Sequence, residues 1–275
     1  MPLPNLIIIG AQKCGTTSMH AYLGRHRQIA MSETKELDFF IDRRNWSKGV
    51  EWYAAQFSDD AAVRGESSPN YTWTRAFPGV PERMHSVVPD ARLIFMVRDP
   101  IQRVISHWIH NYSNGRENRP LAEVVGDHRY YDRSLYWTQV SAFLEHYDRS
   151  RILVVAMDEL QKQARETMRR VFDFLELDDD FREPVFAIQR HRSARKRRKT
   201  RTGAWIAGTR IGRRLDALPG ALRWPVRELL YRPFSRRLER PELAPAEREQ
   251  LAERLRDDTN RFREFAGRDF SDWNV

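Results

Sequence analysis

The strongest constraint on the fold lies at the start of the chain, where an apolar strand runs into a glycine-framed loop. The segment reads Asn5-Leu-Ile-Ile-Ile-Gly10-Ala-Gln-Lys13-Cys-Gly15-Thr16-Thr17-Ser18. Such a loop, followed by the start of a helix, directs backbone N–H groups at one point and suits a phosphate. We therefore expect a mostly parallel sheet with helices on both faces and a nucleotide at the carboxyl ends of its strands.

The order of residues in this loop indicates which class of phosphate ligand it binds. Nucleoside-triphosphatase loops place a lysine directly after the second glycine. Here Thr16 follows Gly15, and Lys13 lies inside the loop next to Cys14. Lys13 can reach atoms beside a 5′-phosphate, and the hydroxyls of Thr16 and Thr17 can bind that phosphate. No residue of the loop is placed to hold a magnesium-bound triphosphate.

A second segment carries a candidate general base. It reads Lys35-Glu36-Leu-Asp38-Phe39-Phe40. A positioned carboxylate can take the proton that a hydroxyl or amine loses as it attacks. Taken alone, the segment fits a solvated glutamate beside two core phenylalanines better than a general base, because most glutamates are exposed.

A third segment offers a site for another phosphate. An apolar strand, Arg92–Val97, ends in Arg98-Asp99-Pro100, and Pro100 is well placed in a first helical turn. An arginine fork matches phosphate oxygens, and Ser106, two turns into the helix, adds a hydroxyl donor. The alternative is an ordinary ion pair between Arg98 and Asp99 at the end of the strand.

These segments, in this order, resemble the sulfotransferases that use 3′-phosphoadenosine 5′-phosphosulfate (PAPS), above all the heparan-sulfate-type N- and 3-O-sulfotransferases. The resemblance extends over about residues 5–178 and includes the Ser134-Leu-Tyr136 helix start. It implies a P-loop-like sulfotransferase fold, PAPS as co-substrate and 3′-phosphoadenosine 5′-phosphate (PAP) as product, without a metal. The roles it implies are a general base at Glu36, leaving-group stabilisation by Lys13, a 5′-phosphate site at Lys13, Cys14, Gly15, Thr16 and Thr17, a 3′-phosphate site at Arg98 and Ser106, and acceptor contacts at Lys35 and Asp38.

Two positions depart from the heparan pattern. Ser67 stands where the family's E-K-[ST]-x-x-Y strand has a lysine, and Asp38 stands where one heparan branch has a histidine. The acceptor is therefore left open between a glycan and a small-molecule metabolite, with either a hydroxyl or an amine as the nucleophile.

Chain length and composition favour one α/β domain over residues 1–275. Strands are expected near Leu6–Gly10, Arg64–Glu66, Leu93–Val97 and Ile152–Ala156. A helix is expected over Leu160–Leu175 and a C-terminal helix over about 246–265. No window approaches eighteen consecutive apolar residues, and Cys14 is the only cysteine. Both facts favour a cytoplasmic protein, and the excess of arginine over lysine suggests a bacterial source. No residues have metal-ligand spacing.

The positive charge is local. The chain has a formal net charge of +9, and the stretch Arg190–Arg201 contains eight Lys or Arg and no acid. This run fits a solvated segment, a nucleic-acid contact, or a loop at about 190–203 that covers the nucleotide, with Arg197 and Arg198 as contacts. It has no interleaved aromatic residues, so we expect no nucleic-acid partner. A P-loop kinase and an RNA-binding protein are the alternatives to a sulfotransferase.

Overall fold

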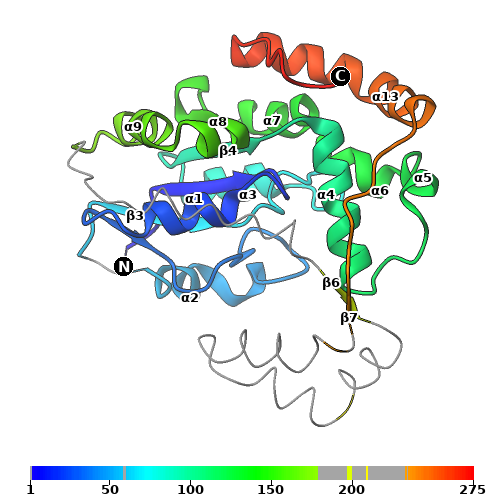
Figure 1. The fold of residues 1–275 in the computed structure, drawn as a ribbon. Helices are drawn as coiled ribbons and strands as arrows, with labels where there is room; N and C mark the ends of the chain where they lie inside the picture. The colour runs from blue at the N-terminus through cyan, green and yellow to red at the C-terminus, as the bar shows by residue number, and fades with distance from the viewer. Residues whose placement is uncertain (1, 58–59, 179–196, 200–208, 210–232, 234) are drawn as a thin grey trace.

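The computed structural model describes residues 2–57, 60–178, 197–199, 209, 233 and 235–275. Over these ranges the chain forms a five-stranded sheet with the order β2-β3-β1-β4-β5. Every neighbouring pair of strands in this sheet is parallel. Helices flank the sheet on both sides (Figure 1), and the expected α/β class is confirmed.

The strands of the sheet are short and mostly buried. They are β1 (Leu6–Gly10), β2 (Ile29–Met31), β3 (Val63–Ser67), β4 (Arg92–Val97) and β5 (Ile152–Ala156). Four of them match the expected strands. The sequence did not predict β2, because three residues are too few to show a hydrophobic period.

The helices follow the strands in alternation. Those before β5 are α1 (Thr16–Leu23), α2 (Gly49–Ala54), α3 (Val80–Val87), α4 (Pro100–Ser113), α5 (Leu121–Val124), α6 (His128–Tyr131) and α7 (Tyr136–Leu144), with short 3₁₀ turns η1 (Trp46–Lys48), η2 (Asp132–Ser134) and η3 (Arg149–Arg151). Those after it are α8 (Met157–Lys162), α9 (Ala164–Phe174) and α13 (Pro245–Ala266). The expected single helix over 160–175 is wrong, since the helix breaks at Gln163, whose φ of −137° is not helical.

Two apolar clusters hold these layers together. The larger one contains β1, β4 and β5, whose inward side chains are almost fully buried. The smaller one joins Ile101 and Val104 of α4 to Leu251 and Leu255 of α13. The C-terminal helix, orange to red in Figure 1, lies against α4 through these contacts and against α7 through Phe262, which packs on Tyr136 in the larger cluster. It therefore braces the helix that follows Arg98.

A two-stranded antiparallel ladder stands apart from the main sheet. It pairs β6 (Arg197–Lys199) with β7 (Ser235–Arg237). Figure 1 draws both strands beside one end of α4, and β6 makes backbone contacts with this helix. The rest of the expected basic loop at about 190–203 lies outside the described residues. No helix in the described ranges is both long enough and apolar enough to span a bilayer.

Strand order places the polar loops at one edge of the sheet. The chain leaves β1 for β2 and β3 on one side and later adds β4 and β5 on the other. In open α/β sheets, ligands bind outside the carboxyl ends of the strands where the order reverses in this way. The loop after β1 and Arg98 after β4 both lie at that reversal.

Gly10 is required by close packing at the end of β1. A Cβ atom built on Gly10 would lie 2.3 Å from Oγ1 and 2.7 Å from Cγ2 of Thr72, whose side chain is buried. Real Cβ atoms do not approach other atoms so closely, so the loop and the segment after β3 pack together only because no side chain intervenes.

We therefore expect Gly10→Ala to lower the free energy of unfolding by about 1–3 kcal/mol, the usual cost of overpacking. Gly126→Ala is the matched control, because a Cβ there would meet nothing within 4 Å. Urea unfolding of both variants measures the difference. Equal stability of the two would show that Thr72 moves away without cost.

Candidate active site

The phosphate loop is held by its own backbone and by β4. The N–H of Ala11 donates to the carbonyl of Met96 at 2.6 Å, and the N–H of Cys14 donates to the carbonyl of Ala11 at 3.2 Å. Helix α1 begins directly after Gly15, whose φ is 90°. The first turn of a helix has N–H groups without intrahelical acceptors. Those of Thr16 and Thr17 therefore face the loop.

Lys13 sits at the bend of this loop. Its φ of 72° is left-handed, and its side chain is half-buried. Its carbonyl accepts a hydrogen bond from Nη1 of Arg98 at 3.5 Å. The structure thus brings together the loop lysine and the arginine after β4, which lie far apart in the sequence. Of the two threonines, Thr16 is buried and Thr17 is exposed.

Tyr136 links the phosphate loop to the residue after β4 on their buried side. Its hydroxyl donates to the carbonyl of Arg98 at 2.9 Å and lies 3.4 Å from the sulfur of Cys14. Burial raises the pKa of the Cys14 thiol, and the contact with Tyr136 offsets only part of this effect. Cys14 therefore acts as a small buried side chain under the loop. Its placement leaves the backbone, rather than the thiol, to face a phosphate.

Arg98 is not paired with Asp99. The carboxylate of Asp99 caps α4 by accepting the N–H of Gln102 at 2.9 Å, and its other oxygen accepts the backbone N–H of Asn274 at 2.8 Å. The Nε of Arg98 is buried without a hydrogen-bond partner among the described residues. The ion-pair reading of this segment is therefore excluded. Ser106 lies buried on α4, the helix that starts beside Arg98.

A cluster of cations surrounds the phosphate loop. Arg103 is fully buried, and burial lowers its pKa to about 10. It donates to Ser134 and to the carbonyl of Tyr130, and its Nη1 has no partner in the described part of the chain. Arg133 donates a hydrogen bond to the side chain of Gln12 in the loop. Its guanidinium carbon lies 3.6 Å from the ring centroid of Trp73. Sequence reasoning missed Arg103, Arg133 and Trp73.

The pKa of His107 reflects the positive charges around it. Burial lowers the pKa of His107 far below its usual range, and Arg103, Arg133 and Lys13 lower it further. Its imidazole is therefore neutral and adds no charge. Asn111 lies 3.2 Å from its Nε2, whereas its Nδ1 is buried without a partner among the described residues.

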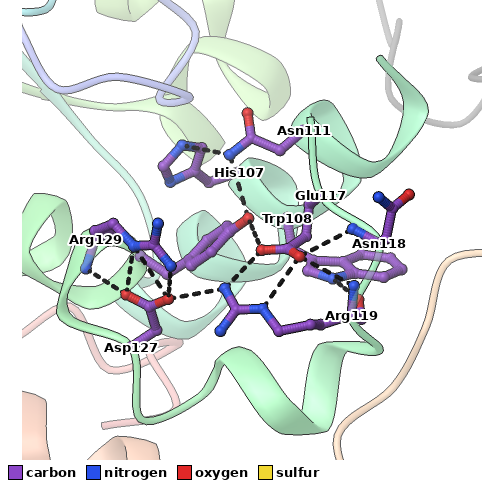
Figure 2. Close-up of polar contacts among 9 residues, drawn as sticks. His107, Trp108, Asn111, Glu117, Asn118, Arg119, Asp127 and Arg129 are labelled. Carbon is purple, nitrogen blue, oxygen red and sulfur yellow. Dashed lines mark hydrogen bonds and ion pairs between the residues drawn. The ribbon is translucent and has the colours of Figure 1, made fainter. Parts of the chain in front are cut away.

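A polar network outside the loop fixes the segment that carries Arg133. Figure 2 shows Arg119 between Glu117 and Asp127, with Arg129 on the far side of Asp127. Nη2 of Arg119 lies 2.7 Å from Oε2 of Glu117 and 2.8 Å from Oδ2 of Asp127. The hydroxyl of Tyr130 donates to Glu117 at 3.0 Å. Hydrogen bonds from Arg119 lower the pKa of Glu117 to about 2. The network remains ionised near neutral pH and ties the end of α4 to α6.

The second predicted segment lies beside β3, next to the phosphate loop. The backbone N–H of Glu36 donates to the carbonyl of Ser67 at 3.0 Å, and Ser67 pairs with Ile8 of β1. The side chain of Glu36 is 47 % exposed and lies 2.8 Å from Nζ of Lys35. Glu36 is thus a carboxylate at the open edge of the sheet, beside a cation. The two phenylalanines that follow it are core residues with no exposed surface.

Asp38 differs from Glu36 in being enclosed. It forms an ion pair with Arg44 and accepts from Nδ2 of Asn70 at 3.3 Å. Burial raises the pKa of Asp38, an effect that Arg44 and Asn70 offset in part. Both oxygens of this carboxylate are therefore engaged by the protein itself. Ser67, at the position of the family lysine, is fully buried as well.

Glu66 is an acid that the sequence did not single out. It is fully buried on β3 and accepts from Tyr53 at 2.6 Å, Tyr71 at 2.9 Å and Ser68 at 2.6 Å. Burial raises its pKa to about 7 in spite of these three hydroxyl donors. The only signal in the sequence is that Glu66 occupies the glutamate position of the family's E-K-[ST]-x-x-Y strand.

Arg197 and Arg198 have a described backbone in β6, while their side chains lie outside the description. Their predicted contact with a nucleotide stays a prediction. Across the described ranges, no group of three or more His, Cys, Asp or Glu side chains is arranged to hold a metal ion.

The raised pKa of Glu66 makes stability depend on pH. The folded protein holds this proton up to about pH 7, whereas the unfolded chain releases it near 4.5. Glu66 therefore stabilises the fold below pH 4.5, and this contribution is lost as pH rises through 7, by on the order of 3 kcal/mol. Glu66→Gln should remove this slope, as urea unfolding at pH 5 and pH 8 can measure. Parallel pH profiles for the variant and the natural protein would contradict a raised pKa.

Comparison with known proteins identifies the family to which the chain belongs. The family model of the sulfotransferase domain matches residues 3–205. The chain is 27% identical over 198 residues to a bifunctional heparan sulfate N-deacetylase/N-sulfotransferase 1 of Caenorhabditis elegans, covering 64% of this chain and 22% of that protein. It is 28% identical over 191 residues to human heparan sulfate glucosamine 3-O-sulfotransferase 5, covering 64% of this chain and 54% of that one.

Two further matches complete this comparison. The membrane-associated sulfotransferase kil1 of Dictyostelium discoideum is 35% identical over 111 residues, covering 38% of this chain and 22% of that protein. The chain thus spans between about a fifth and a half of the length of these relatives. The crystal structure of a sulfotransferase from Alicyclobacillus acidocaldarius superposes with a TM-score of 0.73 at 22% identity, covering 100% of both chains. The chain belongs to the sulfotransferase domain family and has the fold of a sulfotransferase.

Proposed function

We propose that this chain transfers the sulfuryl group of PAPS to a hydroxyl or amine of an acceptor. The observation that carries the proposal is that a phosphate loop, a second cationic site and an exposed carboxylate meet at one edge of the sheet. Arg98 contacts the carbonyl of Lys13, and Glu36 is hydrogen-bonded to the strand that pairs with β1. Acceptor activation and leaving-group stabilisation therefore have adjacent residues to perform them.

The polar groups at this edge suit a doubly phosphorylated nucleotide. The Nε of Arg98 and Nη1 of Arg103 are buried N–H donors without acceptors among the described residues. A buried donor without an acceptor costs about 1–3 kcal/mol, so such groups favour an anionic ligand that supplies one. In this proposal Gly15, Thr16 and Thr17 hold the 5′-phosphate. Arg98 and Ser106 hold the 3′-phosphate, and Arg197 and Arg198 are further contacts of the nucleotide.

Glu36 and Lys13 carry the chemistry. Glu36 takes the proton of the acceptor as the nucleophile attacks sulfur, while Lys13 stabilises the negative charge that develops on the leaving phosphate oxygen. A bond forms between sulfur and the acceptor oxygen or nitrogen as the S–O bond to the phosphate breaks, and PAP leaves. Asp38 is the less suitable base, because Arg44 and Asn70 already occupy its carboxylate. Lys35 and Asp38 then border the acceptor.

The acceptor is a glycan or a small-molecule metabolite. The animal relatives are named for heparan sulfate, and this chain has Ser67 where their strand has a lysine. Incubation with PAPS labelled in the sulfuryl group, against de-N-sulfated heparin, heparan oligosaccharides and phenols, identifies the class by a mass gain of one sulfuryl group. If the protein binds PAP but transfers no sulfuryl group to any acceptor of this panel, the acceptor is a metabolite outside the panel.

PAP should stabilise the protein more than AMP, because AMP lacks the 3′-phosphate. At a ligand concentration one hundredfold above the dissociation constant, the gain should be about 2.7 kcal/mol, visible as a higher melting temperature. Arg98→Ala should remove most of the difference between PAP and AMP. Equal shifts with both ligands in the natural protein would exclude a 3′-phosphate site at Arg98.

Glu36→Gln should keep the affinity for PAP and lower turnover by about 10²–10⁴-fold, the usual contribution of a general base. Glu33→Gln is the matched control, since Glu33 is an exposed acid of the same stretch. Isothermal titration with PAP and initial rates with the acceptor from the panel measure both quantities. Full activity of Glu36→Gln would assign the base elsewhere.

A further inference from the structure

The segment that carries Glu36 has a strained backbone. Glu36 has a φ of 65° and Asp38 a φ of 48°, both in the left-handed region. A residue other than glycine is held in this region only when its surroundings fix it. The carboxylate of Glu36 can face the acceptor in a defined way only if something maintains this conformation.

Hydrogen bonds from β3 and from the following loop supply that restraint. The N–H of Asp38 donates to Oγ of Ser68 at 3.0 Å. Ser68 in turn donates its own proton to Oε2 of Glu66 at 2.6 Å. Nδ2 of Asn45 donates to the carbonyl of Leu37, the residue between the two strained ones, at 2.7 Å. The backbone between Glu36 and Asp38 is therefore tied to a buried carboxylate.

When Glu66 is ionised, the direction of each hydrogen bond in this series is fixed. The hydroxyl of Ser68 accepts from Asp38, so it must use its single proton toward Glu66. The other oxygen of Glu66 already accepts from Tyr53 and Tyr71. Only a group that accepts at both oxygens satisfies all three hydroxyls. An amide at position 66 would present an NH₂ to one of these donors.

We propose that Glu66 is a positioning residue, which orients Glu36 for catalysis through Ser68 and the backbone of Asp38. This inference rests on the proposed role of Glu36. Apolar packing supports the same segment from below, because Phe39 stacks on Tyr53 with ring centroids 4.2 Å apart. The hydroxyl of Tyr53 contacts Oε1 of Glu66, whereas the link to Asp38 runs through Oε2.

This division provides a matched pair of variants. Ser68→Ala removes the link between Glu66 and Asp38, whereas Tyr53→Phe removes a hydrogen bond to the same carboxylate and leaves the link intact. Glu66→Gln replaces one acceptor oxygen of the carboxylate by an NH₂ group, which donates. All three should lower the melting temperature, because each disturbs a buried hydrogen bond. Only Ser68→Ala and Glu66→Gln should disturb the segment that carries Glu36.

The test combines hydrogen exchange and kinetics at pH 8, where Glu66 is ionised, and at a temperature far below each melting point. Peptides that cover residues 35–41 should exchange at least about tenfold faster in Ser68→Ala and Glu66→Gln than in Tyr53→Phe. The kcat of the first two should fall by about 10–100-fold, with the Kd for PAP and the kcat of Tyr53→Phe unchanged. Equal exchange and equal kcat for Ser68→Ala and Tyr53→Phe would overturn the proposal.

The variant Glu36→Gln separates this inference from the proposed function. If Glu36→Gln loses activity and Ser68→Ala does not, the general base stands and the positioning role is refuted. If Glu36→Gln keeps full activity, the general base is refuted. Faster exchange of residues 35–41 would then show a purely structural link.

Discussion

Strand β1 is hydrogen-bonded to β3 on one side and to β4 on the other, and the site depends on this parallel pairing. It brings the ends of three strands to the same edge, so the phosphate loop, Glu66 and Arg98 become neighbours although they are far apart in the sequence. The hydrogen bond from the N–H of Ala11 to the carbonyl of Met96 then fixes the position of the loop relative to β4. A change in the register of β1 would displace all of these groups together.

Charge balance at this edge is uneven, and the unevenness has a physical cause. Three of the acids near it are engaged inside the protein: Asp99 caps a helix, Asp38 pairs with Arg44, and Glu66 accepts hydrogen bonds from three hydroxyls. The cations nearby keep unpartnered N–H groups, as Arg98, Arg103 and Arg133 do among the described residues. A region built in this way has a positive potential, which attracts an anionic ligand and strengthens its contacts in a medium of low dielectric.

The sequence was sufficient for the elements whose signal is local. The apolar run before Gly10 predicted β1, and Pro100 after a buried strand predicted the start of α4. The glycines of the loop after β1, together with Lys13, predict a phosphate site there. By contrast, Tyr136, Arg103 and Glu66 act through partners that are distant in the sequence, and no spacing reveals such partners before the chain is folded. The break in the helix at Gln163 also escaped prediction, since helix propensity alone does not penalise glutamine.

The burial of Cys14 has a practical consequence for solution work. A thiol whose pKa is raised by burial stays protonated, and thiolates are the species that react with maleimides. Because the chain contains one cysteine, a second cysteine introduced on the surface becomes the single reactive thiol of the folded protein. A fluorophore or spin label can then be attached at one chosen position without replacing Cys14.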